Sequence, residues 1–319
     1  MTGIIIINPY KIPAQSIAQA ERLKEEFAKL GVFAEIVSDG YARVFVDEKG
    51  VRLDEKFSES DFFVYLDKDK YISDMLERSG KRVFDLHKTI RVCDDKGETY
   101  VALAAGGFPV CKTVFAPLCY REDLPVPQGF IESVEREITY PVIVKESYGS
   151  MGKGVFKAEN REELKKISER LKGLPHLYQE FAGAKSGTDM RVIVIGGVAA
   201  AAMFRVNEKD FRSNIALGGR GFKIDLRGDC ENGGAGESKL CSGNREYDID
   251  IKDFIKTAER AAKYLNADYC GVDLLIGDNG EPIICEVNSN AFFEEIEKVT
   301  GVNVAAVYAK HILSSVAGK

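Results

Sequence analysis

The segment Asp278-Asn279-Gly280 constrains the fold most, because it lies between two runs of residues that are typical of β-strands. Asn-Gly between such runs is a strong signal for a β-hairpin with a two-residue loop. If the asparagine and the glycine form that loop, counting outward along both strands places Asp273 directly opposite Glu286. The sequence therefore predicts a hairpin over residues 269–287 that carries two facing carboxylates.

Two further positions of this hairpin fall on the same face, since side chains alternate between the two faces of a strand. They are Gly271 and Asn288, which are also opposite one another. Facing carboxylates repel each other unless a cation lies between them. A small set of oxygen ligands suits Mg²⁺, which completes its octahedron with water and phosphate oxygens. We therefore predict a metal site at Asp273, Glu286 and Asn288. The alternative is a solvated polar face, and a bulge would shift the register.

The segment 145–154 contains three glycines, flanked by Lys145 and Lys153, and it follows a β-rich run. Glycines let backbone N–H groups approach an anion closely, and the lysines supply positive charge. The segment is not a Walker A loop, because Lys-Ser/Thr does not close it and no helix follows at once. It predicts a phosphate-binding loop, with a plain hairpin turn as the alternative.

Two other clusters suit ligand recognition. Residues 178–181 (YQEF), followed by Asp189 and Arg191, combine an aromatic ring and acids that could hold a nucleoside, although Asp189 and Arg191 could instead pair with each other. Arg205 and the segment 210–214 (DFRSN) place arginines beside small polar residues. Such clusters suit phosphate or carboxylate recognition, and a charged loop is the alternative.

Along the chain, strand and helix signals alternate over the first 90 residues or so, which favours a small parallel α/β domain. Later segments predict short strands around an amphipathic helix at 161–171, a hairpin at Gly196-Gly197, and two closing helices. Residues 227–245 are rich in glycine, serine and charge, and are predicted to be a long surface loop, either mobile or a functional lid.

The composition argues against several classes of protein. The net charge of -6 and the pI of about 5.4 argue against a general nucleic-acid or membrane-surface binder, and leave open a local basic patch. No apolar stretch approaches transmembrane length and no targeting signal is visible, so cytoplasm is the expected location. The seven cysteines form no C-x-x-C pair and the chain has three histidines, which favours reduced thiols over disulfides or zinc.

In this order, the motifs resemble the ATP-grasp superfamily, and more narrowly the RimK-type α-L-glutamate ligase family. The matching stretches are Asp95-Lys96, 141–154 (PVIVKESYGSMGKG), 179–191 (QEFAGAKSGTDMR), 200–219 (AAAMFRVNEKDFRSNIALGG), 271–290 (GVDLLIGDNGEPIICEVNSN) and 300–302 (TGV). The resemblance implies a mixed α/β and α+β chain. An N-terminal parallel α/β pre-domain (1–94) precedes two α+β subdomains, 95–181 and 182–319, which clasp ATP.

The resemblance also implies roles for single residues. Those that match Lys96 and Lys145 contact phosphates, and the matches of Glu180, Phe181 and Asp189 hold the adenosine. The remaining residues expected to bind the nucleotide are Gly149, Ser150, Gly152, Gly154, Gln179, Arg212, Ser213 and Asn214. Those expected to act on the phosphoryl group and the reacting carboxylate are Lys145, Arg205, Arg212, Asn214 and Arg220. In the family, the matches of Asp273, Glu286 and Asn288 bind two Mg²⁺ ions, for which Mn²⁺ is a substitute.

The implied activity is ATP-dependent amide-bond formation through an acyl phosphate. The family analogy makes L-glutamate the carboxylate donor, added to an amine of a protein tail, a peptide or a small molecule. Homodimers or homotetramers occur in the family. Departures at 215–219, 290–293 and 227–245 surround the expected acceptor side and concern the substrate. The alternatives are a ligase for another amino acid or a biosynthetic carrier, and a non-catalytic nucleotide-binding regulator.

Overall fold

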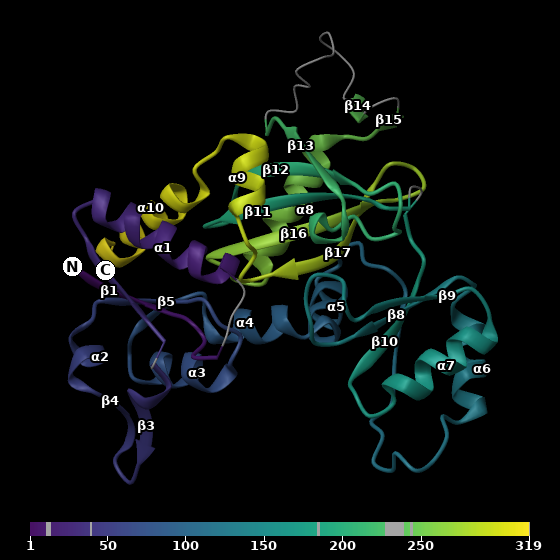
Figure 1. Cartoon of the computed structure of the whole chain (residues 1–319), viewed down its shortest axis with the longest axis horizontal. Coiled ribbons are helices and arrows are strands. Elements are labelled where there is room, and N and C mark those ends of the chain that lie inside the picture. Colours follow the sequence, from purple (N-terminus) through teal and green to yellow (C-terminus); the bar gives the residue numbers. More distant parts are fainter. Residues whose placement is uncertain (11–13, 39, 184–185, 227–238, 243–244, 319) are drawn as a thin grey trace.

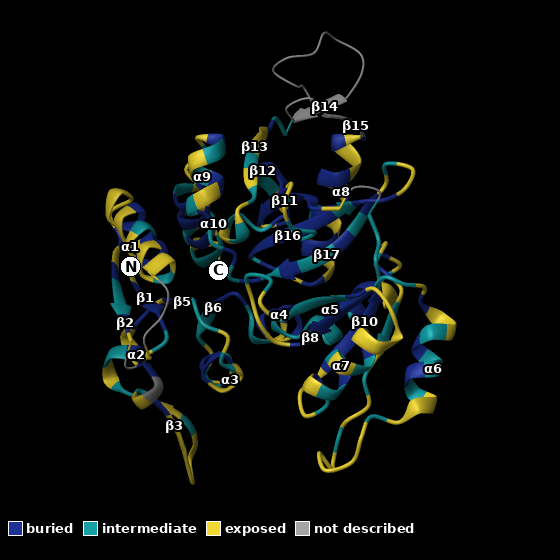
Figure 2. Cartoon of the chain, turned by 45° about the vertical axis from the view of Figure 1, so that its right-hand side comes forward, coloured by how far each residue is buried: buried dark blue, intermediate teal, exposed yellow. Residues whose placement is uncertain are grey.

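The computed structural model describes residues 1–318, apart from 11–13, 39, 184–185, 227–238 and 243–244. It contains one parallel and two antiparallel sheets of three or more strands, with helices against their faces (Figure 1). Buried residues are concentrated in the strands and in the helix faces turned toward them (Figure 2). The mixed α/β and α+β class predicted from the sequence is therefore confirmed.

The N-terminal part forms a four-stranded parallel sheet in the order β2-β1-β5-β6. Its strands are β1 (Thr2–Ile6), β2 (Phe33–Val37), β5 (Phe62–Tyr65) and β6 (Arg82–Phe84). Around it lie α1 (Ala14–Lys29), η1 (Gly40–Ala42), the hairpin β3 (Val44–Asp47) and β4 (Gly50–Leu53), α2 (Glu55–Glu59) and α3 (Lys70–Arg78). All four residues of β5 are buried, as expected for a parallel strand covered on both faces.

The middle part forms a four-stranded antiparallel sheet in the order β7-β10-β8-β9. Its elements are β7 (Thr113–Phe115), α6 (Gln128–Glu137), β8 (Val142–Glu146), β9 (Val155–Ala158), α7 (Arg161–Leu171) and β10 (His176–Glu180). Before it come α4 (His87–Asp94) and α5 (Lys96–Ala105). Helix α5 begins where the Asp95 carboxylate accepts hydrogen bonds from the backbone N–H groups of Gly97 and Glu98, which fixes Lys96 in the first turn.

The largest sheet is five-stranded and antiparallel, in the order β13-β12-β11-β16-β17. Its elements are β11 (Thr188–Ile195), β12 (Val198–Val206), η2 (Ile215–Leu217), β13 (Arg220–Ile224), α8 (Ile251–Tyr264), β16 (Tyr269–Ile276), β17 (Pro282–Asn288), α9 (Glu294–Thr300) and α10 (Val304–Ala317). One face packs against α8 and α5, and the other against α9 and α10. One end of this second face is charged rather than apolar, and it carries the candidate site.

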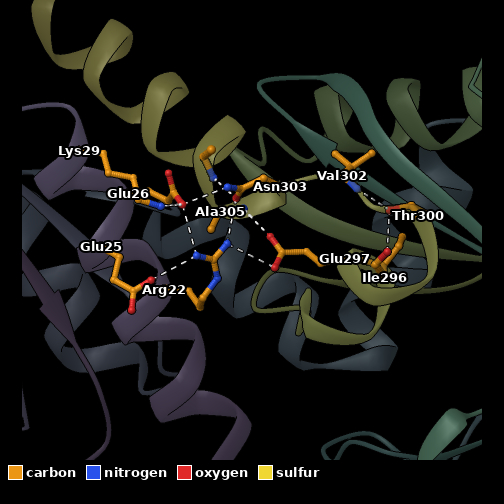
Figure 3. A network of polar contacts seen from close by, with 11 residues as sticks. Arg22, Glu25, Glu26, Lys29, Ile296, Glu297, Thr300, Val302, Asn303 and Ala305 are labelled. Atoms are coloured by element: carbon orange, nitrogen blue, oxygen red, sulfur yellow. Dashed lines mark hydrogen bonds and ion pairs between the residues drawn. The ribbon is translucent and has the colours of Figure 1, made fainter.

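The N-terminal sheet and the largest sheet are joined through α1 and α10, and a polar network lies at this junction (Figure 3). Arg22 on α1 donates to Asn303 Oδ1 at 3.1 Å and pairs with Glu297 at 3.7 Å. Asn303 in turn donates to Glu26 Oε1 at 3.0 Å. Hydrogen bonds from Asn303 and Lys29 hold the pKa of Glu26 below its usual range. The junction thus combines this polar network with buried apolar contacts between α1 and α10.

Two local predictions are wrong. The loop between β16 and β17 has three residues, 278–280, because Gly277 donates to the carbonyl of Glu281 at 2.8 Å. Within 227–245, a short antiparallel pair forms from β14 (Lys239–Ser242) and β15 (Arg245–Asp248), so the predicted loop does not extend through it. The rest of that prediction, 227–238 and 243–244, lies outside the described residues.

In the described part of the chain, no helix combines the length and the apolar character needed to cross a membrane.

Candidate active site

A pocket lies between the middle sheet and the charged end of the largest sheet. The predicted nucleotide, catalytic and metal residues that line it are Lys96, Lys145, Gly149, Ser150, Gly152, Gly154, Gln179, Glu180, Phe181, Asp189, Arg205, Arg212, Ser213, Asn214, Asp273 and Glu286. Two predicted residues are not part of this lining. Arg220 is exposed at the start of β13, and Asn288 lies at the end of β17, opposite Gly271.

The hairpin β16–β17 places Asp273 opposite Glu286, as predicted, although the loop is one residue longer than expected. Two irregularities cancel each other. The register shifts between Asp273 and Leu274, where Cys285 is the extra residue of a β-bulge. Gly271 does not leave an open space, since a Cβ there would lie 2.6 Å from the Cβ of Ala291. The structure therefore confirms that Asp273 and Glu286 face each other, and the bulge keeps them opposite one another.

Asp273 is held by two arginines from the next two strands of the sheet, β11 and β12. Arg191 on β11 donates through Nε to Oδ1 at 2.7 Å and through Nη2 to Oδ2 at 2.6 Å. Arg205 on β12 lies 2.9 Å from the same Oδ2 and also pairs with Asp189. Burial raises the pKa of Asp273, but Arg191 and Arg205 outweigh it and lower the pKa to about 2. The carboxylate is consequently ionised at neutral pH.

The donor set fits magnesium better than a transition metal. No group of three or more His, Cys, Asp or Glu side chains in the described residues is placed to hold a metal. Asp273, Glu286 and Asn288 offer oxygen atoms alone, and so few of them that water or phosphate oxygens must complete an octahedron. Glu286 also pairs with Lys96 Nζ at 3.3 Å, so its charge is balanced before any ion binds.

Lys145 on β8 is a buried cation with neutral partners. Its Nζ donates to Tyr100 Oη at 3.1 Å and lies 3.7 Å from Cys285 Sγ, and no described carboxylate pairs with it. A buried charge without a counter-ion is costly. The position is therefore suited to an incoming anion such as a phosphate.

The glycine-rich loop between β8 and β9 is folded over the pocket. Lys96 Nζ donates to the carbonyl of Gly149 at 2.8 Å, and Arg212 Nη1 donates to the carbonyl of Gly152 at 2.7 Å. Gly152 has a φ of 72°, and a Cβ there would meet Asn214 Oδ1 at 3.0 Å. Left-handed backbone and close packing both require glycine at this position. The loop thus connects the two sheets above the pocket.

The far end of the pocket carries groups that could hold a base and a ribose. Gln179 is buried and donates to Thr113 Oγ1 at 2.8 Å, and Glu180 accepts from the backbone N–H of Lys112 at 2.8 Å. The ring of Phe181 lies 6.4 Å from that of Phe211, while Lys157 Nζ lies 4.7 Å from its centroid. Asp189, predicted near the adenosine, is engaged by Arg205 instead of by Arg191.

Three residues of the site were not predicted from the sequence: Arg191 as the partner of Asp273, and Tyr100 and Cys285 beside Lys145. The alternation of Asp189 and Arg191 on one strand face was visible in the sequence. Nothing in the sequence indicated that Tyr100, one turn into α5, reaches Lys145 and also donates to the carbonyl of Cys285.

A family model described as the RimK-like ATP-grasp domain matches residues 94–235 and 225–312. A probable alpha-L-glutamate ligase of Maridesulfovibrio salexigens is 35% identical over 222 residues, which cover 68% of this chain and 62% of that protein. Human N-acetylaspartylglutamate synthase A is 29% identical over 255 residues, covering 79% of this chain and 57% of that protein. The chain thus spans only part of the length of both relatives.

The fold is also similar to a solved structure. The D-alanine–D-alanine ligase of Bacillus anthracis, complexed with ATP, superposes with a TM-score of 0.69 over 99% of this chain and 97% of that chain. The sequence identity is 14%, so this likeness concerns the fold alone.

Proposed function

Because this chain belongs to the RimK-like ATP-grasp family, we propose that it is an ATP-dependent carboxylate–amine ligase that adds L-glutamate to a protein, peptide or small molecule. The observation that carries the proposal is Lys145, a buried ammonium with no described carboxylate partner, placed under a glycine-rich loop and beside facing carboxylates. This arrangement suits the phosphates of MgATP. In this proposal, 1–94 is a pre-domain, and 95–181 and 182–319 form the two halves of the clasp.

The reaction proceeds in two steps. A carboxylate oxygen attacks the γ-phosphorus of ATP, and ADP leaves as the acyl phosphate forms. The amine nitrogen then attacks the acyl carbon, the amide bond forms, and inorganic phosphate and a proton are released. Lys145 and Arg212 offset the charge of the transferred phosphoryl group, which is the main contribution that a protein makes to such transfers.

Asp273, Glu286 and Asn288 would hold two Mg²⁺ ions, or Mn²⁺ in their place, and the bound ions would neutralise phosphate charge. The contact between Arg212 and the carbonyl of Gly152 keeps the loop closed over the pocket, and a closed loop excludes water from a hydrolysable intermediate. We place the reaction in the cytoplasm, because the five cysteines whose side chains the structure describes are free thiols.

The test is ADP release from the purified protein with MgATP, over a matrix of amino acids and amines in which glutamate can serve as either the acid or the amine. ADP release that requires one particular pair of compounds, together with the coupled product by mass spectrometry, is the expected result. Glu286→Gln should remain folded and lose at least about a hundredfold in turnover. Wild-type turnover in that variant would contradict the metal assignment.

A second candidate is a nucleotide-binding regulator without turnover. The outcome that favours it is measurable MgATP binding together with no pair-dependent ADP release. The charged end of the largest sheet argues against it, since Arg205 and Asp273 line the pocket and Arg191 holds Asp273 in a defined geometry.

A further inference from the structure

The three hydrogen bonds on Asp273 limit what else this carboxylate can bind. Arg191 uses one lone pair of Oδ1 and one of Oδ2, and Arg205 uses a second lone pair of Oδ2. An ionised carboxylate has about four lone-pair sites, two on each oxygen. One site therefore remains, and it is on Oδ1.

The arginine fork cannot move aside easily. Asp273 is 4% exposed, and Arg191 is its direct neighbour across the β11–β16 ladder. Arg205 is 2% exposed and is held in turn by Asp189, so the Oδ2 side is closed by a second fixed group. Buried networks in which every member has partners are rigid.

A carboxylate that is limited to one oxygen treats two biological cations differently. Mg²⁺ requires near-ideal octahedral geometry and is usually bound through one oxygen of each carboxylate. Ca²⁺ is larger, takes more oxygen ligands, and commonly uses both oxygens of a carboxylate. Blocking Oδ2 removes that option at Asp273.

We propose that Arg191 is a positioning residue that fixes Asp273 as a single-oxygen ligand, and thereby sets the preference of the site for magnesium over calcium. This inference rests on the proposed function, because Asp273 is a metal ligand only in that proposal. Arg205 contributes to the same geometry but also bonds Asp189, so Arg191 is the residue through which the effect can be isolated.

A purely structural role for Arg191, namely neutralising a buried charge, makes a different prediction. Removing a positive charge near a cation site strengthens the binding of any divalent ion, so Mg²⁺ and Ca²⁺ would gain alike. The single-oxygen restriction acts on the ratio between the two ions. The ratio therefore separates geometry from charge.

The test uses two variants and one control. Arg191→Lys keeps the charge and loses the two-point fork, whereas Arg191→Gln also loses the charge. The control is Arg121→Lys, which removes a fork of the same kind to Asp123, at 3.1 and 2.7 Å, from an exposed surface outside the pocket. Each protein is saturated with a non-hydrolysable ATP analogue and Mn²⁺, and Mg²⁺ or Ca²⁺ is titrated in while electron paramagnetic resonance follows the released Mn²⁺.

We expect wild type and Arg121→Lys to release Mn²⁺ at lower Mg²⁺ than Ca²⁺ concentrations, and both Arg191 variants to lose about tenfold of that preference. An unchanged ratio in a folded Arg191→Lys protein overturns the positioning role alone, with the proposed function intact. Failure of wild type to hold Mn²⁺ with the nucleotide analogue overturns the proposed function and this inference together.

Discussion

The pocket has two walls that manage charge in opposite ways. On the largest sheet, Asp189, Arg191, Arg205 and Asp273 alternate in sign and bond one another across three strands. On the middle sheet, Lys145 is also buried but has a hydroxyl and a thiol as partners. The charges on the largest sheet are balanced without a ligand, whereas the charge of Lys145 is not. The largest sheet can therefore hold a fixed geometry, and Lys145 is stabilised when an anion binds.

Removing one member of the ion-pair network on the largest sheet should cause the largest loss of stability. Arg205→Met leaves Asp189 and Asp273 buried without their shared partner, and we expect a loss of about 3–5 kcal/mol in the free energy of unfolding. Urea denaturation followed by circular dichroism measures it. A loss below 1 kcal/mol would show that the network is not what holds these strands together.

Removing the Lys145 charge from the middle sheet should not reduce stability in this way. Lys145→Met removes a buried charge that has no described counter-ion, so the free energy of unfolding of the nucleotide-free protein should stay within about 1 kcal/mol of wild type or rise. ATP affinity, measured by calorimetry, should fall by about tenfold or more because a charge-assisted contact to phosphate is lost. A destabilisation as large as that of Arg205→Met would contradict the contrast between the walls.

The loop that connects the walls offers a smaller effect. Gly152→Ala forces a residue with a Cβ into a φ of 72° against Asn214, at a cost of about 1–2 kcal/mol in the closed loop. Because opening of the loop would relieve this strain without unfolding the protein, turnover should fall by about tenfold while thermal stability changes little. Gly129→Ala is the matched control, since its added Cβ meets no atom within 4 Å. Equal loss of turnover in both variants would exclude loop closure as the cause.

Asp85 is a second buried carboxylate, and its pKa is shifted in the opposite direction from that of Asp273. Burial, and then the charge of Asp268, raise the pKa of Asp85 well above its usual range, and its Oδ2 has no hydrogen-bond partner in the described structure. The folded chain therefore retains a proton that the unfolded chain loses above pH of about 4. Stability from this group is full below that pH and declines as pH rises, by up to about 1.4 kcal/mol per pH unit.

Asp85→Asn removes this titration, and its Oδ1 can still accept from the backbone N–H groups of Asp268 and Tyr269. The difference in stability between the variant and wild type should move in favour of the variant between pH 4 and pH 7. A difference that is independent of pH would mean that Asp85 is ionised in the folded protein.

Counting along a hairpin predicted one half of the site and would have missed the other. Asp273 faces Glu286 because the bulge at Cys285 offsets the extra loop residue. In the hairpin β11–β12, the register shifts after Ile193 with no such compensation, so counting outward from Gly196-Gly197 misplaces Asp189 by one residue relative to Arg205. Bulges depend on tertiary packing, which local sequence does not record.

Contacts between distant segments were equally out of reach. The pairing of β11 with β16 joins Arg191 to Asp273 over 82 residues. Lys145 meets Tyr100 only because α5, which packs against the largest sheet, begins beside the end of β8. The sequence predicted the fold class and most of the pocket lining through motifs whose chemistry is local, such as the glycine-rich loop. The sequence did not predict which basic side chain pairs with which acidic side chain.

The most direct test of the account is to identify the products formed when hydroxylamine replaces the amine, using MgATP and the acid found in the substrate screen. We expect one acyl hydroxamate for each ADP released, and loss of both products in Glu286→Gln. Release of AMP and pyrophosphate, or ADP release without any hydroxamate, would contradict the proposal that the pocket transfers the γ-phosphoryl group to a carboxylate.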